Sequence, residues 1–371
     1  MDFDPTPKRR SWNSTAFIAC SWIMWLLTGC NNPAAREPVP PPEPRPSDEF
    51  LRTEVALHPD APLHESSNTL YCGTFQLAWN KFVDRFGKSD KWTEVVNPRL
   101  AQRLNNRSLD EKEIEADSIF TFAGILTPGT KQEFIQQLHS KFPGAKIPEL
   151  PWNSNAMISY ALLEKTLHFR TAFDRLPADS FPKGSTDRVN YFGIDPNARR
   201  SGWKHPGSNA ILLHYTNPDE FVVELENDNL GDHLVLTRMP RQETLSQAIA
   251  YADKLASKTE STEWIIINRL AIPVFHLGIE RKYEELFKDD SGKDFPVVEI
   301  PPIALQTIQF RLDEAGAVLK SEATFAASVS AAPKYVDLIF DQPFLLTLRY
   351  ASSKHPYFAI WVENAEILER E

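Results

Sequence analysis

The chain has 371 residues, of which 42% are hydrophobic, and it carries a formal net charge of -10. This length and composition suffice to bury a large core, in one big domain or in two ordinary ones. The negative charge, without any Lys/Arg-rich face, argues against binding to a nucleic-acid backbone. We therefore expect no nucleic-acid partner.

Residues 1–30 have the pattern of an export signal. Basic residues from Lys8 to Arg10 precede an apolar run, Ala16–Leu27, that is too short for a comfortable transmembrane helix. The run ends in Leu27-Thr28-Gly29-Cys30, which is similar to a bacterial lipobox, where the Cys thiol takes a diacylglycerol. The alternative is a plain signal peptide, or an uncleaved anchor, that happens to end in Cys.

Lipidation of Cys30 would decide where the protein resides. Each buried CH₂ of an acyl chain contributes about 0.8 kcal/mol to membrane binding, so a multiply acylated Cys30 would be held firmly. We expect a protein that is exported and anchored to a lipid membrane through Cys30, in the periplasm or at the cell surface. Residues 31–49 are rich in proline, which favours a semi-rigid linker of about 3 Å per residue. Residues 50–371 then form the folded domain.

The three cysteines leave little sulfur chemistry to the domain. Cys20 lies in the export signal and Cys30 is the lipidation site, which leaves Cys72. No intramolecular disulfide and no Cys-based metal site is therefore expected. We interpret Cys72 as a buried, inert thiol in preference to a nucleophile.

Hydrophobic periodicity and turn residues predict a mixed α and β body without internal repeats. Thr130 followed by Glu133 has the spacing of a helix-capping box. In chain order the expected elements are a helix over Thr69–Phe86, a strand over Asp117–Leu126, a helix over Thr130–Phe142, a strand over Ala156–Phe169, strands over Ala210–Tyr215, Phe221–Leu225 and Leu234–Met239, a helix over Gln242–Leu255, a strand over Trp264–Phe275 interrupted at Pro273, and a short helix over Arg281–Phe287.

The end of the chain is its most informative part. Two apolar, strand-like runs, Phe340–Arg349 and Tyr357–Asn364, follow a long connection. The connection starts with Leu312-Asp313-Glu314-Ala315-Gly316-Ala317-Val318 and continues into a small-residue stretch, Thr324–Ala332. Connections longer than about 12–15 residues are usually functional or disordered. This segment is therefore the first place to look for function.

This layout resembles the C-terminal part of a serpin, in which a hinge and a reactive-centre loop precede an F-x-x-P-F strand and a final buried strand. Four other segments are similar to serpin segments in the same order along the chain: Ile119–Ala145, Met157–Asp174, Ile211–Met239 and Ile265–Phe287. The resemblance implies an α+β, serpin-like fold with large mixed and antiparallel central sheets, helices and an exposed reactive-centre-like loop.

The resemblance also implies a site and a function. The hinge residues would be Glu314, Gly316 and Ala317, and the spacing of the family places the scissile bond near Ser330–Ala331. The protein would be a monomeric protease inhibitor and not an enzyme, and its partner would be a serine or cysteine protease.

The chain departs from the serpin pattern at positions that govern sheet opening. Asn68 is not followed by the family's S-P-x-S, and the family's conserved Trp is replaced near Leu167. The residues between Leu150 and Ala156 leave no room for the helix that normally covers the main sheet, and Ala317 is not followed by a run of Ala. A non-inhibitory binding protein of the cell envelope with the same fold is therefore the alternative.

Insertion of the loop into a sheet requires side chains that alternate between a core face and a solvent face. The mainly apolar and small set consists of Ala317, Leu319, Ser321, Ala323, Phe325, Ala327 and Val329. The largely polar set consists of Val318, Lys320, Glu322, Thr324, Ala326, Ser328 and Ser330. This alternation is compatible with insertion, although any exposed edge strand alternates in the same way.

Known catalytic motifs are absent from the sequence. It contains no G-x-S-x-G, H-E-x-x-H, Walker A or G-x-G-x-x-G. Asp289-Asp290 and Glu284-Glu285 are typical of solvated turns or helix faces. Ser208, within His205-Pro206-Gly207-Ser208, superficially offers a nucleophile, but without a placed base and a group that orients it the signal is negligible. The histidines interpreted as loop or strand-surface groups are His205, His214 and His233. We expect no catalytic residue, no metal and no cofactor.

Overall fold

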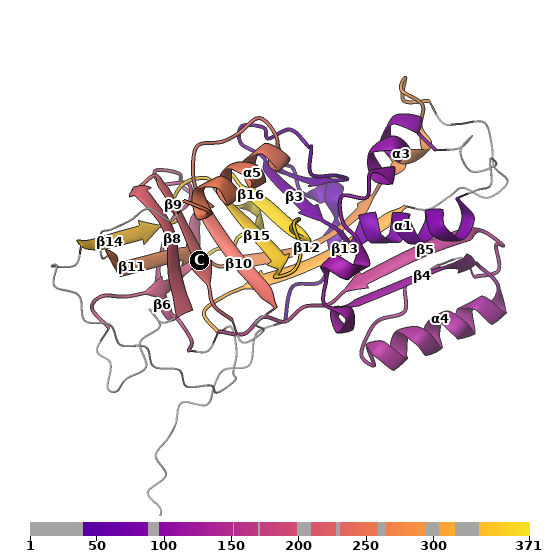
Figure 1. The fold of residues 1–371 in the computed structure, drawn as a ribbon, viewed down its shortest axis with the longest axis horizontal. Helices are drawn as coiled ribbons and strands as arrows, with labels where there is room; N and C mark the ends of the chain where they lie inside the picture. The colour runs from indigo at the N-terminus through magenta and orange to yellow at the C-terminus, as the bar shows by residue number, and fades with distance from the viewer. Residues whose placement is uncertain are drawn as a thin grey trace, which may run out of the picture. The chain divides into compact units, whose positions relative to one another are not determined.

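The computed structural model describes residues 40–87, 96–150, 152–169, 171–198, 209–227, 231–258, 265–293, 295, 304–315 and 334–371. These residues all belong to one compact unit. Figure 1 shows strands of several sheets with helices packed on them, and the C-terminal strands lie in the middle of the largest sheet.

The largest sheet combines strands from both ends of the described chain. Among the described residues it has seven strands in the order β2, β3, β16, β15, β10, β9, β8. Neighbours are antiparallel except for the parallel pair β2–β3. The bounds are β2 Thr53–Ala56, β3 Asn68–Cys72, β16 Phe358–Val362, β15 Phe344–Tyr350, β10 Asp232–Arg238, β9 Glu220–Leu225 and β8 Ala210–Asn217.

Three smaller sheets complete the described architecture. A four-stranded sheet has the order β14, β11, β7, β6, a three-stranded sheet has the order β1, β12, β13, and β4 pairs with β5. The strands are β14 Lys334–Ile339, β11 Ile265–Pro273, β7 Arg188–Ile194, β6 Asp174–Ser180, β1 Arg45–Pro46, β12 Phe275–Lys282, β13 Leu305–Leu312, β4 Ile119–Ile125 and β5 Met157–Leu163.

Three of the described α-helices begin at side chains that satisfy their free N–H groups, whereas α1 begins after Gly73 without such a cap. The side chains of Asn97, Thr127 and Thr244 accept backbone hydrogen bonds at the starts of α3, α4 and α5, respectively. The bounds are α1 Thr74–Phe86, α3 Pro98–Asn105, α4 Pro128–Lys141 and α5 Leu245–Ala256.

The helices cover the sheets on defined faces. Helix α5 packs on the seven-stranded sheet, where its apolar residues share a cluster with strand residues such as Val222, Leu345 and Trp361. Helix α4 packs on β4 through Phe134 and Leu138. Helix α1 contacts β4, β5 and β13. All positions of β16 are buried, because the seven-stranded sheet is covered on both faces there.

Most of the expected elements are confirmed, and the errors have physical causes. The helix expected over Thr69–Phe86 was wrong at its start, because the residues from Asn68 to Cys72 form β3. All five β3 positions are buried, so the apolar pattern there has no period that separates strand from helix. The helix expected from Thr130 begins at Pro128 and is capped by Thr127.

Other boundaries were also misplaced. The strand expected over Ala156–Phe169 ends at Leu163. The helix expected over Arg281–Phe287 is a 3-10 turn over Glu284–Phe287, because Arg281 and Lys282 belong to β12. The α+β fold class with large mixed and antiparallel sheets is confirmed.

The end of the proline-rich segment lies on the folded unit. Within residues 40–49, which we expected to belong to the linker, Arg45–Pro46 pairs with β12 in parallel. No helix among the described residues is both long enough and apolar enough to cross a membrane. The expected export signal and Cys30 lie outside the described residues.

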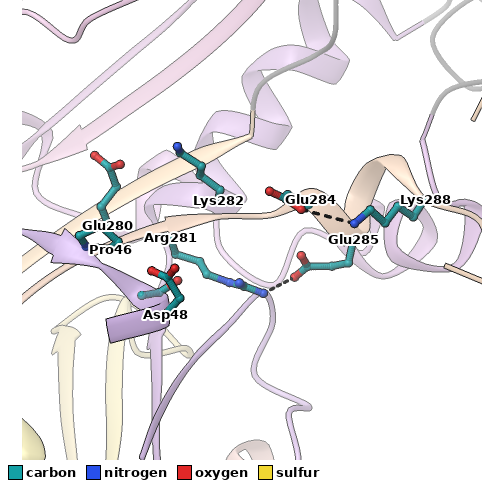
Figure 2. Close-up of a pocket in the computed structure, with 9 residues that line it drawn as sticks. Pro46, Asp48, Glu280, Arg281, Lys282, Glu284, Glu285 and Lys288 are labelled. Carbon is teal, nitrogen blue, oxygen red and sulfur yellow. Dashed lines mark hydrogen bonds and ion pairs between the residues drawn. The ribbon is translucent and has the colours of Figure 1, made fainter. Parts of the chain in front are cut away.

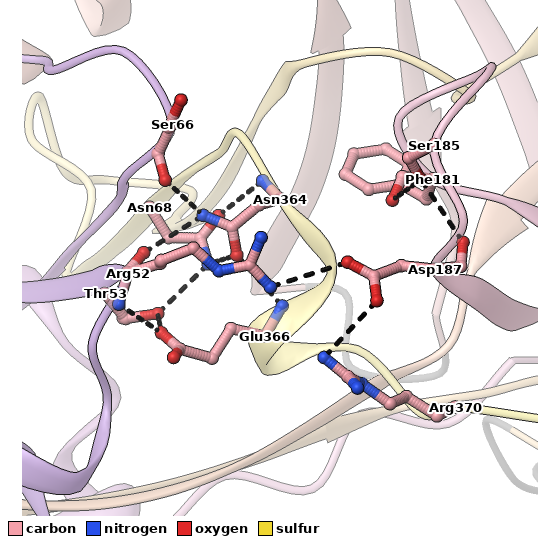
Figure 3. Close-up of polar contacts among 10 residues, drawn as sticks. All are labelled: Arg52, Thr53, Ser66, Asn68, Phe181, Ser185, Asp187, Asn364, Glu366 and Arg370. Atoms are coloured by element: carbon pink, nitrogen blue, oxygen red, sulfur yellow. Dashed lines mark hydrogen bonds and ion pairs between the residues drawn. The ribbon is translucent and has the colours of Figure 1, made fainter.

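A buried polar network joins the first strands to the last turn of the chain (Figure 3). The Asn68 side chain is fully buried; it donates to Thr53 Oγ1 and Asn364 Oδ1, each at 3.0 Å. Its oxygen accepts from the backbone N–H groups of Glu363 and Asn364 at 2.8 and 2.9 Å. The Glu366 carboxylate in turn accepts from Arg52 N and Thr53 Oγ1. Every hydrogen-bonding position of the Asn68 amide is therefore used.

We predict that Asn68→Ala lowers the free energy of unfolding by about 2–4 kcal/mol, because it leaves several buried polar groups without a partner. Urea denaturation measures this value. Asn153→Ala, at an exposed position, is the matched control and should change the value by less than about 0.5 kcal/mol. Equal stabilities for the two variants would contradict a structural role for the network.

Candidate functional site

The site predicted from sequence lies between β13 and β14. Glu314 is described and sits in the turn that follows β13. Gly316, Ala317, Ser330 and Ala331 lie outside the described residues. The site is therefore built here from its two attachment points, residues 313–315 and strand β14.

The first attachment point holds Glu314, the glutamate predicted to be a hinge residue, close to β6. The Glu314 carboxylate forms an ion pair with Arg175 of β6, and its side chain is only 10% exposed. The Glu314 carbonyl accepts a hydrogen bond from Phe173 N at 3.1 Å. Ala315, the next residue, is buried. The chain is thus fixed in position up to the residue before segment 316–333.

A second carboxylate strengthens the same turn. Asp313 is buried, and its side chain accepts from Arg311 Nε at 2.8 Å and from Ala315 N at 2.9 Å. The guanidinium of Arg311 also contacts Glu369 Oε2 at 2.8 Å. Partly buried ion pairs are less screened by solvent than exposed pairs. The hinge is therefore connected to β13 and to the C-terminal residues.

The second attachment point is β14 and the F-x-x-P-F motif after it. β14 runs parallel to β11, and Asn268 donates to Asp337 Oδ1 at 2.7 Å. Phe340 is fully buried, with ring centroids of Phe221 and Phe344 each at 5.0 Å. The motif thus packs into the core, while Tyr335 of β14 is 64% exposed.

The two attachment points belong to different sheets. Among the described residues, β13 is an end strand of the sheet β1–β12–β13, and β14 is an end strand of the sheet that contains β11. In the described part of the chain, β13 and β5 each have one neighbouring strand. An edge of this kind presents N–H and C=O groups to which another strand can pair.

Helix α1 connects these two edge strands on their core side (Figure 1). Ser159 of β5 donates to the Ala78 carbonyl in α1 at 2.6 Å. Gln306 of β13 donates to Thr74 Oγ1, in the first residue of α1, at 2.6 Å. Strands β5 and β13 therefore lie under the same helix although they belong to separate sheets.

The chain that follows β5 is fixed by a buried ion pair. Lys165 Nζ lies 2.5 Å from Asp232 Oδ2 and 2.6 Å from Glu115 Oε2. Tyr357 donates its hydroxyl hydrogen to Asp232 Oδ1 at 3.0 Å. The Lys165 side chain is 8% exposed and the Asp232 side chain is 0% exposed, so breaking this pair would leave charges buried.

Two hollows lie near the ends of the sheets. One of about 740 Å³ lies beside β14 and includes Tyr335, Asp337 and Arg238 in its wall. The other, of about 550 Å³, lies where β1 meets β12 (Figure 2). Two ion pairs, Arg281–Glu285 and Lys288–Glu284, lie within its wall. The acidic pair Glu284-Glu285 is thus part of a charged surface, as the sequence indicated.

The reactive side chains considered from sequence do not assemble into a catalytic site in the described residues. Cys72 is buried, and this burial raises the pKa of its thiol, which supports its interpretation as inert. His214 lies on β8 and contacts Thr216, and His233 lies on β10 with Glu224 at 2.5 Å. His205 and Ser208 lie outside the described residues. The described residues contain no group of three or more metal-ligating side chains.

The comparisons with known proteins give a likeness only at the level of structure. No family model matches the sequence, and no curated protein matches it. The structure of thyroxine-binding globulin in complex with thyroxine is 13% identical in sequence and has a TM-score of 0.39. The match covers 82% of this chain and 93% of the globulin chain. A serpin of Arabidopsis in its native stressed conformation is 12% identical and has a TM-score of 0.43, and the match covers 81% of this chain and 92% of the serpin chain.

Human glycosylated kallistatin is similar to the same extent. It is 14% identical and has a TM-score of 0.42, and the match covers 80% of this chain and 91% of the kallistatin chain. Identities this low and TM-scores below 0.5 do not assign the chain to a family. The case for function therefore rests on the residues of this chain.

The sequence predicts Glu314 as a hinge residue but gives no sign of the residues that it contacts. Arg175 lies 139 positions from Glu314, and no local pattern connects the two. Lys165 and Asp232 are likewise far apart in sequence. The one local signal was the i, i+2 pair of Arg311 and Asp313, which have opposite charges and lie at the end of a strand.

Proposed function

We propose that this protein is a serpin-type inhibitor of a serine protease and is held on a membrane through Cys30. The observation that carries the proposal is the attachment of segment 316–333. The segment follows β13 and precedes β14, which are strands of two different sheets, and Glu314 at its start is held by Arg175. In the described part of the chain β13 is an end strand, beside which another strand can pair. A bait segment needs fixed ends and a place for the cut strand.

The proposed chemistry belongs to the protease. Its serine hydroxyl oxygen attacks the carbonyl carbon of the residue before the scissile bond, near Ser330, and forms an ester. The amide bond breaks, and the nitrogen of the next residue, near Ala331, leaves with a proton supplied by the protease histidine. Small residues at this bond favour an elastase-like protease.

The cut strand would then pair with β5 and β13. Alternation within residues 317–329 places Ala317, Leu319 and other small or apolar side chains on the core face. The new strand would satisfy backbone groups of both edge strands, and this pairing provides the free energy that traps the acyl-enzyme. Ser159 and Gln306 already anchor these strands to α1, so the inserted strand would pack against a helix that is fixed to both of its neighbours.

A second function is favoured by the hinge itself. Asp313 and Glu314 are both largely buried and ion-paired, which ties the hinge to Arg311 and Arg175. A hinge held in this way suits a non-inhibitory binding protein, in which segment 316–333 acts as a recognition element. Cleavage followed by measurement of thermal stability separates the two functions.

We predict that cleavage near residue 330 raises the melting temperature by about 10 °C or more. Each net hydrogen bond contributes about 1 kcal/mol, and 1 kcal/mol shifts the Tm of a domain of roughly 150–250 residues by about 2–4 °C. Calorimetry before and after limited elastase cleavage, with the cut mapped by mass spectrometry, measures the shift. An unchanged Tm would contradict insertion and favour the binding protein.

Two adjacent substitutions provide the matched control. Ala327→Glu places a charge on the core-facing set and should abolish the rise in Tm, whereas Ala326→Glu on the solvent-facing set should preserve it. The same pair tests inhibition with a serine protease. A complex that survives SDS should form with the wild-type chain and with Ala326→Glu, and Ala327→Glu should be cleaved without complex formation.

We predict that Cys30→Ser abolishes lipid attachment and membrane association, because acyl chains supply the membrane affinity. Metabolic labelling with a radioactive fatty acid and fractionation of a bacterial host measure both. Cys72→Ser is the control and should leave labelling unchanged. Membrane association that persists in Cys30→Ser would show that the apolar run Ala16–Leu27 acts as an uncleaved anchor.

A further inference from the structure

The end of the proline-rich segment crosses the outer face of the sheet β12–β13. Gln309 of β13 donates to the Pro42 carbonyl at 2.8 Å. Gln309 is the cross-strand partner of Gly278 in β12, so the segment passes over this residue pair. Buried side chains of β13, such as Ile308, point to the core, whereas Gln309 is exposed on the opposite face.

Gly278 is the residue that permits this approach. A Cβ atom added there would lie 2.6 Å from the Pro42 carbonyl oxygen and 2.7 Å from that of Glu43. Both distances are too short for any real side chain. Glycine within a strand often marks a place where another backbone comes close. The absence of a side chain at Gly278 is therefore explained by the segment that lies on it.

The segment is held on both sides of this crossing. Glu43 pairs with Lys146 at 2.9 and 3.1 Å, and Lys146 follows α4, the helix that packs on β4. After the crossing, Arg45 and Pro46 pair with Ile279 and Glu280 at the edge of β12. Figure 2 shows Pro46 beside Glu280 at this edge. The Arg45 guanidinium lies 4.6 Å from the centre of the Phe50 ring.

These contacts join the two sheets whose terminal strands are β5 and β13. Helix α1 joins them on the core side through Ser159 and Gln306. Residues 40–46 join them on the outer face, from Gln309 in one sheet to Lys146 beside the other. Glu43 and Lys146 are both about four-fifths exposed, so their attraction is weak and easily broken.

We propose that residues 40–46 are a strap that restrains the separation of β5 and β13. The strap is the last part of the proline-rich segment, so it connects the linker directly to the sheet edges. Displacement of residues 40–46, by a pull on the linker or by cleavage within these residues, would release the outer tie and leave the tie through α1. Access to the two strand edges is thereby coupled to the state of the linker.

The first measurement asks whether the strap is docked in solution. The full chain carrying Cys30→Ser is treated with a carbodiimide, which joins a carboxylate and an amine in direct contact. Peptide mass spectrometry should find the Glu43–Lys146 cross-link in this chain and in Thr307→Val, an outer-face control on β13. Gly278→Val should lose most of it, because the valine side chain occupies the space of the strap. An undiminished cross-link in Gly278→Val overturns the proposal.

The second measurement asks what the strap restrains. Hydrogen–deuterium exchange of the same proteins should be several-fold faster in β5 and β13 of Gly278→Val and Gln309→Leu than in the parent chain or Thr307→Val. Exchange in β9 and β10 should stay unchanged. Unchanged exchange in β5 and β13, or a rise shared equally by β9 and β10, overturns the strap.

The cross-linking and exchange measurements test the strap independently of protease inhibition. A chain that shows the change in exchange but forms no SDS-stable complex would contradict the proposed function and leave the strap intact. A chain that inhibits a protease and shows no change in exchange would contradict only the strap.

Discussion

Backbone hydrogen bonding at the edges of β5 and β13 is the constraint on which the proposed function depends. A strand edge offers N–H and C=O groups at fixed spacing, and each such group gains by pairing with another strand. In the described part of the chain these two strands end separate sheets, yet both contact α1. Segment 316–333 leaves from the end of one of them. Its attachment and the strand edges together form the region on which the proposed function depends.

The rest of the described structure holds this region in place by long-range polar contacts. The Arg175–Glu314 pair fixes the turn after β13, and the Lys165–Asp232 pair fixes the chain after β5. The Asn68 network joins the first strands of the large sheet to the end of the chain. Pairs that are buried tolerate little movement, because separation would expose unpaired charges to an apolar interior. The exposed Glu43–Lys146 pair is the weak link among these ties.

Many of the strands and helices can be predicted from the sequence, whereas most contacts of the candidate site cannot. Strands such as β9 and β15 were readable because short apolar runs are bounded by turn residues such as Asn217-Pro218-Asp219. The all-buried strand β3 was taken for the start of a helix, since a run buried on every side has no period. Glu314 is predicted as a hinge residue from its neighbours in sequence, whereas the contacts of Arg175 and Lys165 can be identified only in the folded chain.

The proline-rich segment likewise makes a contact that its sequence does not predict. Its composition predicts an extended linker and contains no sign that Pro42 and Glu43 lie on Gly278. The signal that pointed to this contact was the glycine within a strand, which is informative only after its neighbours in space are known.

The most direct test of the central claim is a crystal structure of the chain after cleavage near residue 330. The account predicts that residues 317–329 form a strand between β5 and β13, hydrogen-bonded to both, with Ala317, Leu319 and Ala323 facing the core. A cleaved structure in which β5 and β13 still end separate sheets, with no strand between them, would contradict the account.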